Sequence, residues 1–250
     1  MLIDSRRFTD SAGTGQVRGS ADTKRKERKL ESFIDFTIES LPALLKGTLV
    51  TLQIWVICIV IGTVLGILLS LCRVYGKGII YNGATAYIEI FRGTPQLVQM
   101  FIIYIGLPDI GIVLRPFVAA SISIALNTAA YQAEYFRGAI FSVEIGQMLA
   151  ARSLGMTKAK AIRKIILPQA FRISMPQWSN EVILELKMTS IGFAIGVSEL
   201  MAQAKMIGFR TFRYVEIFIL AAIIYLIIVT FFSMLLDSAE RKFKTPGQLG

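Results

Sequence analysis

The chain has 250 residues, of which 54% are apolar and 18% are charged, and its formal net charge is +10. Soluble domains are on average less apolar and more heavily charged, so this composition predicts a membrane protein. Histidine is absent, which excludes histidine-based catalysis and histidine metal sites, and the spacing of Cys58 and Cys72 in one apolar run predicts neither a disulfide framework nor a metal site.

Two segments precede the first apolar run long enough to span a membrane. Residues 1–30 are polar and end in a charged run from Lys24 to Lys29, which is typical of a solvated tail. No apolar region follows at the distance expected for a signal peptide. Residues 31–46 have an amphipathic pattern, so we expect a short helix at the membrane interface.

Residues 47–240 are predicted to form the membrane domain. The first and last runs, 47–72 and 217–236, carry no charge and are each long enough to cross a bilayer as a helix. Three further runs, each containing charged residues, cover residues 81–107, 116–136 and 173–197. We therefore predict an all-α membrane protein with about five transmembrane helices, followed by a short cytoplasmic tail over residues 241–250.

Basic residues are concentrated on one side of these predicted helices. Residues 137–172 hold seven basic residues and one acid, and the C-terminal tail is also basic. Because basic loops stay in the cytoplasm, both belong there, and five spans then place the N-terminus outside. The basic N-terminal run conflicts with that placement, which leaves open a further re-entrant segment or a tail too far from the first span to count. The net charge is typical of cytoplasmic loops, and we expect no nucleic-acid partner.

The loop over residues 142–168 is rich in helix formers, and Gly146 and Gly155 are almost its only breakers. We predict a short amphipathic helix on the cytoplasmic side that ends near Gly155, because glycine readily adopts the positive φ of such a turn. An ordered basic helix between two spans suits the docking of a partner protein. The alternative is a solvated loop made basic only by the orientation bias.

The spacing within this loop resembles the EAA motif of ABC-importer permeases. The matching residues are Ala150, Ala151, Gly155, Ile165, Leu167 and Pro168. Leu149 stands where the motif has a glutamate. The resemblance implies that these residues form a coupling helix against an ATP-hydrolysing subunit, with small alanines allowing close approach to the partner and Pro168 beginning the next membrane segment.

The resemblance extends from about residue 41 to residue 243. Residues 89–95 and 127–138 resemble the second- and third-span signatures of polar amino-acid permeases, and residues 187–190 resemble the family's K-D-T-S stretch with Met188 in place of the aspartate. The chain is identified as a member of the ABC-importer permeases for polar amino acids such as histidine, glutamine or arginine. That implies a type I importer bundle in the cell membrane.

The resemblance also implies the partners. They are two ATP-binding subunits, a second permease subunit that is a copy or a paralogue, an extracytoplasmic amino-acid-binding protein and the lipid bilayer. The chain contains no G-x-x-x-x-G-K-[ST] sequence, so ATP and Mg²⁺ are expected on the ATPase, with no cofactor and no catalytic residue on this chain. The alternative function is an ion- or proton-coupled secondary transporter that uses intramembrane carboxylates.

Charged residues inside the predicted spans mark candidate sites, because each costs at least ~2.5–3.5 kcal/mol at the centre of a membrane helix. Glu89 with Arg92, and Glu134 with Arg137, are three residues apart and can neutralise each other on one helix face. We assign both pairs to the locking of helices near a gate, where Pro95 bends or ends its helix. Direct contact with the substrate is the alternative.

A second group of polar residues forms the candidate substrate path. The group consists of Asn127, Tyr131, Asn180, Glu181, Glu185 and Lys187. Glu181 and Glu185 lie four residues apart and repel each other unless a cation or proton lies between them. One hypothesis is that either carboxylate holds the cationic part of an amino acid while Lys187 meets a carboxylate. An ion-paired contact between helices is the alternative.

Overall fold

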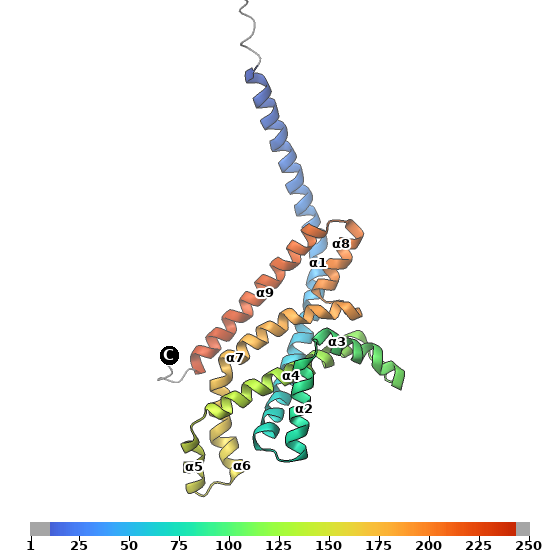
Figure 1. Cartoon of the computed structure of the whole chain (residues 1–250). Helices are drawn as coiled ribbons and strands as arrows, with labels where there is room; N and C mark the ends of the chain where they lie inside the picture. Colours follow the sequence, from blue (N-terminus) through green and yellow to red (C-terminus); the bar gives the residue numbers. More distant parts are fainter. Residues whose placement is uncertain (1–10, 244–250) are drawn as a thin grey trace, which may run out of the picture.

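The computed structural model describes residues 11–243, and the side chains of residues 31–242. All regular structure in this part of the chain is helical (Figure 1), which confirms the predicted all-α class. The helices are α1 Ser11–Tyr75, α2 Ile79–Gly93, α3 Gln96–Phe101, α4 Pro116–Ser142, α5 Ile145–Ser153, α6 Lys158–Ala161, α7 Leu167–Met188, α8 Leu200–Thr211 and α9 Tyr214–Phe243. Short π- and 3₁₀-helical turns extend them, namely η1 Ile102–Gly106, η2 Leu107–Ile110, η3 Ile162–Ile166 and η4 Thr189–Ile195.

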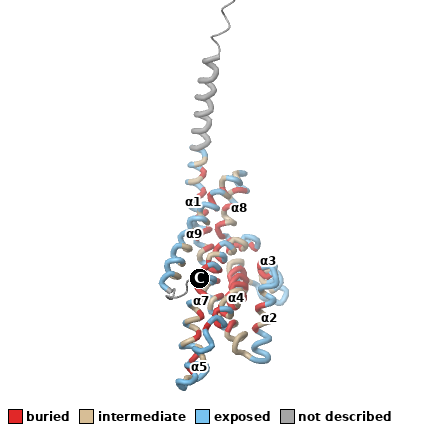
Figure 2. The backbone as a smooth tube through the Cα atoms, turned by 60° about the vertical axis from the view of Figure 1, so that its left-hand side comes forward, coloured by how far each residue is buried: buried red, intermediate tan, exposed pale blue. Residues whose placement is uncertain are grey.

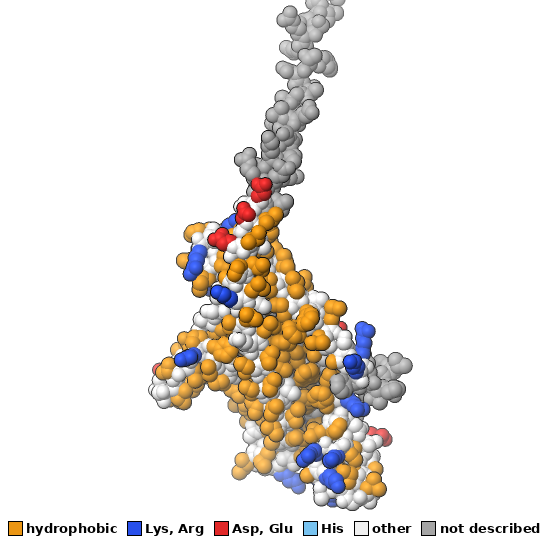
Figure 3. All heavy atoms as spheres, turned by 180° about the vertical axis from the view of Figure 1, so that it is seen from behind, with side chains coloured by type: hydrophobic (Ala, Val, Ile, Leu, Met, Phe, Trp, Pro, Cys, Tyr) orange, Lys and Arg blue, Asp and Glu red, His pale blue; other side chains and the backbone are white. Residues whose placement is uncertain are grey.

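Two helices of the described part are long and apolar enough to cross a membrane, over Glu31–Tyr75 in α1 and Tyr214–Lys242 in α9. They contain the first and last predicted spans. The three middle spans fall on shorter or interrupted elements: α2, α3 and η1 share the second, α4 contains the third, and α7 with η4 contains the fourth. Figure 3 shows apolar side chains over most of the middle of one face, with charged side chains mainly toward its ends.

Residues 31–46 are not the separate interfacial helix that we expected. They belong to α1, which runs through Pro42 without ending. Phe36 and Leu44 are buried and pack with residues of α8 and α9 in one apolar cluster. The amphipathic pattern therefore serves helix packing. The tails predicted over residues 1–30 and 241–250 lie wholly or mostly outside the residues whose side chains are described, and they stay predictions.

Helix α4 lies between α1, α2 and α7 and is the most deeply buried helix in Figure 2. Its buried face is built largely from alanine, serine and threonine, and small residues allow membrane helices to approach closely. Two glycines of α1 face it: a Cβ atom on Gly62 would lie 2.7 Å from Thr128, and one on Gly66 would lie 2.9 Å from Gln132. The α1–α4 contact therefore depends on the absence of side chains at these two positions.

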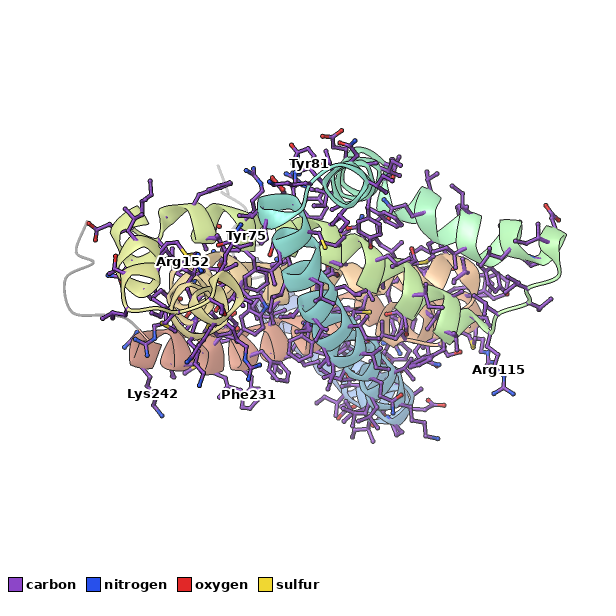
Figure 4. The ribbon with its side chains drawn as sticks, turned by 90° about the horizontal axis from the view of Figure 1, so that it is seen from below. Tyr75, Tyr81, Arg115, Arg152, Phe231 and Lys242 are labelled. Carbon is purple, nitrogen blue, oxygen red and sulfur yellow. The ribbon has the colours of Figure 1, made fainter. Side chains whose placement is uncertain are left out.

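The two ends of the bundle differ in the segments they carry. Figure 4 shows Arg152 of α5 and Lys242 of α9 at one end, and Arg115 at the opposite end. The loop over residues 142–168 and the end of α9 thus lie on the same side, as the orientation deduced from lysine and arginine requires.

Gly66→Leu is expected to overpack the α1–α4 contact and to lower the free energy of unfolding by about 1–3 kcal/mol. The measurement is the Tm of the purified protein in detergent. Gly83→Leu in α2 is the matched control, because nothing lies within 4 Å of a Cβ at that position and leucine favours the helix more than glycine does. An equal fall in Tm for both variants would contradict the assignment of this contact.

Candidate functional site

The second predicted span breaks between α2 and α3, at Pro95. Proline has no N–H, so the carbonyl of Phe91, four residues earlier, loses its helical donor. The side-chain amides of Gln99 and Asn127 donate to this carbonyl instead, at 2.8 Å and 3.0 Å. Asn127 also donates to Gln99 at 3.1 Å. Asn127 of α4, a candidate path residue, therefore stabilises the break by donating to the carbonyl that Pro95 leaves without a helical donor.

Sequence reasoning missed Gln99. Its side-chain amide also donates to the carbonyl and the hydroxyl of Thr94, at 3.0 Å and 2.8 Å. The signal was available, because an amide side chain one helical turn after a proline in an apolar run can satisfy the carbonyls that the proline frees.

Glu134 of α4 is the centre of an ion-pair cluster that includes Arg92, close to this break in the chain. Its carboxylate lies 2.6 Å from Arg73 of α1, 2.7 Å from Arg137 of the same helix and 3.7 Å from Arg92 of α2. The Glu134 side chain is only 14% exposed. The cluster therefore joins three helices through one carboxylate and includes the predicted Glu134–Arg137 pair.

The predicted local pair between Glu89 and Arg92 is wrong, since no ion pair joins them in the described part of the chain. Arg92 instead faces Glu134 and lies over the Tyr131 ring, 5.3 Å from its centroid. Glu89 lies 3.6 Å from Arg73. Packing of α1 and α2 against α4 supplies these partners from other helices, which the spacing within one helix cannot reveal.

An open cavity of about 410 Å³ lies beside the break and the cluster. Four of the six candidate path residues line it: Asn127 and Tyr131 from α4, and Glu181 and Glu185 from α7. Arg92 and Pro95, which we had assigned to the gate, line it as well. The cavity therefore places both predicted groups at one site.

Two candidate path residues do not line the cavity, and one residue that does line it was not predicted. Asn180 and Lys187 are exposed and do not line the cavity, because they point to other sides of α7 than Glu181 and Glu185. Tyr135 does line it and donates from its hydroxyl to Glu181 at 2.9 Å. Tyr135 lies one turn after Tyr131 on the same face of α4, and this periodicity would have found it.

The loop over residues 142–168 forms a helical hairpin. Helix α5 ends at Ser153 and the chain turns through Gly155, whose φ is +77°, which confirms the predicted glycine turn. Thr157 then caps α6. Pro168 lies in the first turn of α7, as predicted.

The six residues of the motif divide into exposed and buried ones. Ala150 and Gly155 are exposed, but Ala151 is only 1% exposed. We had expected the small side chain of Ala151 to allow close approach to a partner. It instead allows close packing within this chain. Ile165 and Leu167 pack in a cluster that includes residues at the end of α1. Pro168 is exposed. Ala151 and the partly buried Ile165 and Leu167 therefore pack the hairpin against the membrane helices.

The hairpin also carries an exposed apolar surface that the motif did not indicate. Ile145, Leu149 and Leu154 are 77%, 63% and 83% exposed. Exposed apolar side chains gathered at one place are typical of a protein contact. Leu149 is the position where the motif has a glutamate, so part of this surface is apolar where a polar contact was expected.

The region of this chain that is similar to known proteins includes the break, the ion-pair cluster, the cavity and the hairpin. Residues 62–245 match the family described as "Binding-protein-dependent transport system inner membrane component". The "Probable amino-acid ABC transporter permease protein YckA" of Bacillus subtilis is 42% identical over 206 residues, which are 82% of this chain and 91% of that protein. The "Glutamine transport system permease protein GlnP" of Escherichia coli is 39% identical over 207 residues, which are 82% of this chain and 94% of that protein.

A solved structure is also similar to this chain. It is a crystal structure of an amino acid ABC transporter with histidines, with a TM-score of 0.77 at 39% identity, covering 82% of this chain and 96% of that chain. This likeness confirms the predicted fold class of a type I importer permease.

Glu134→Gln is expected to lower the free energy of unfolding by about 1–3 kcal/mol, because it leaves partly buried arginines without a counter-charge. Glu89→Gln is the matched control with the same chemical change. The Glu89 side chain is 68% exposed, so its loss is expected to cost less than about 1 kcal/mol. Thermal unfolding in detergent measures both, and a smaller effect at Glu134 than at Glu89 would refute the central role of Glu134.

Proposed function

The chain belongs to the family of binding-protein-dependent transport system inner membrane components, and from this membership we propose that it is the membrane-spanning subunit of an ATP-driven importer of polar amino acids. The observation that carries the proposal is the 42% identity to an amino-acid ABC transporter permease over 82% of this chain. The similar region includes both the cavity and the hairpin. The same relatives give no support to an ion-coupled secondary transporter.

Members of this family work in the inner membrane with an ATP-binding subunit and a substrate-binding protein as separate chains. For this protein we propose two ATP-binding subunits and two permease subunits, either two copies of this chain or this chain with a paralogue. ATP and Mg²⁺ are bound by the ATP-binding subunits in this proposal, and this chain is not itself an enzyme. Gly93 and Pro95 line the cavity and are exposed, which supports a path completed by the second permease subunit.

The exposed apolar side chains of the hairpin support its role as the dock for the ATP-binding subunit. The buried cluster behind them supports the transmission of movement, because Ile166 and Ala170 join the hairpin to α7 in one packed unit. Helix α7 carries Glu181 and Glu185 into the cavity. Closure of the ATP-binding subunits would therefore displace α5 and shift α7 as a rigid element.

The proposed function is tested by co-purification with the ATP-binding subunit, followed by uptake into proteoliposomes supplied with the binding protein. Amino-acid uptake that orthovanadate stops and a protonophore leaves intact is the expected result. Recovery of the chain without any ATP-binding subunit, together with uptake that a protonophore abolishes, would favour the ion-coupled alternative and overturn the proposal.

Leu154→Asp is expected to weaken association with the ATP-binding subunit on the order of tenfold or more, because it places a charge in an apolar contact. The measurement is the affinity of the purified subunits for each other. Val113→Asp is the matched control, since Val113 is 81% exposed and Leu154 is 83% exposed, but residue 113 lies in the loop at the opposite end, next to Arg115. If the two variants bind equally well, the hairpin is not the dock.

A further inference from the structure

Two buried carboxylates line the cavity from one face of α7. Glu181 is 4% exposed and Glu185 is 2% exposed, and residues four apart lie one helical turn from each other. Both carboxylates border the same cavity of about 410 Å³. This volume lies in the range of pockets that enclose small molecules.

The two carboxylates differ in the partners they have. Glu181 accepts a hydrogen bond from Tyr135 at 2.9 Å. Within the described part of the chain the Oε2 atom of Glu185 has no hydrogen-bond donor, and the Thr128 hydroxyl of α4 donates to the Ile124 carbonyl at 2.8 Å. Neither carboxylate belongs to any ion pair of the described residues. Glu185 thus lines the cavity without an ion-pair partner, and one of its two oxygens is buried without a donor.

The basic side chain of the cavity lining is shared with a carboxylate of α4, and 41% of its surface stays exposed. Arg92 is the cationic residue among its lining, and this guanidinium lies 3.7 Å from Glu134 and over the Tyr131 ring. The lining therefore carries one basic and two acidic side chains. Uncompensated negative charge within a membrane protein is costly, and a cation that enters the cavity relieves this cost.

We propose that the cavity selects amino acids with a cationic side chain, and that Glu185 is the residue that determines this selectivity. The ammonium or guanidinium group of the substrate lies against Glu185 and Glu181, and the substrate carboxylate points toward Arg92. A substrate with a net charge of +1 balances the lining. This inference rests on the proposed function, because it assumes that the cavity is part of the transport path.

Glu185 is assigned the selective role because Glu181 already has a donor, the Tyr135 hydroxyl. A ligand cation adds a charge-assisted hydrogen bond to Glu185 that no protein group supplies, and such bonds are stronger than neutral ones. A neutral amide side chain of similar length gains less from the same carboxylate. The preference for a cation should therefore disappear when Glu185 becomes a neutral isostere.

The experiment uses the assembled membrane complex without the binding protein, so that only the cavity selects. Binding of radiolabelled arginine, lysine and glutamine is measured in detergent. Arginine and lysine are expected to bind the unsubstituted complex more tightly than glutamine. Glu185→Gln is expected to weaken arginine binding about 10- to 100-fold and to leave glutamine binding within about twofold of its former value.

Two further variants keep the test decisive if Glu185→Gln does not fold. Met188→Lys places an ammonium group on the same lining, one turn after Glu185, and is expected to remove the preference for arginine over glutamine. Asp237→Asn is the matched control, because it removes one negative charge from an exposed position on α9 and is expected to leave binding unchanged.

The possible outcomes separate this inference from the proposed function. A complex that binds and transports glutamine as well as arginine, or keeps its preference in Glu185→Gln or in Met188→Lys, overturns the cationic selectivity while the importer function stands. A complex that transports no amino acid at all, even with the binding protein and ATP, overturns the proposed function itself.

Discussion

Helix α4 supplies polar contacts to its neighbouring helices in a medium without water. Its Asn127 donates to the carbonyl that Pro95 leaves without a helical donor. Its Glu134 is the shared partner of Arg73, Arg92 and Arg137. Both contacts cross from one helix to another, so the break in the second span and the position of Arg92 beside the cavity depend on how α4 packs. The small residues along α4 allow this packing.

In the chain, α4 is followed by the hairpin, and the hairpin is followed by α7. Helices α4 and α7 both line the cavity. Helix α4 ends at Ser142, α5 begins at Ile145, and η3 continues into α7. The buried cluster around Ile166 and Ala170 fastens these elements together. Helix α4, which bears Asn127 and Tyr131, therefore ends beside the surface that we propose as the dock, and α7, which bears Glu181 and Glu185, begins beside it. In this architecture the proposed dock on α5 and the cavity wall formed by α7 are connected through two short elements, α6 and η3.

Features that depend on neighbours in sequence were predictable. The uncharged runs indicated the first and last membrane helices, Pro95 indicated the break, and Gly155 indicated the turn with positive φ, which the structure has at +77°. Helical periodicity also placed Asn127 with Tyr131, and Glu181 with Glu185. The same periodicity did not bring Asn180 to the cavity, because a residue next to Glu181 is rotated by about 100° around the helix.

Composition and apolar run length by themselves determined that this chain is a helical membrane protein. The resemblance in motif spacing indicated an importer permease, with a basic loop over residues 142–168 that is predicted to face the cytoplasm. The tertiary structure alone decided which charges meet: Arg92 pairs with Glu134 and not with Glu89, and Arg73 joins the cluster from α1. The physical reason is that local spacing sets which residues share one face of a helix. The partner of that face is set by the approach of other helices, here of α1 to α4 across Gly62 and Gly66.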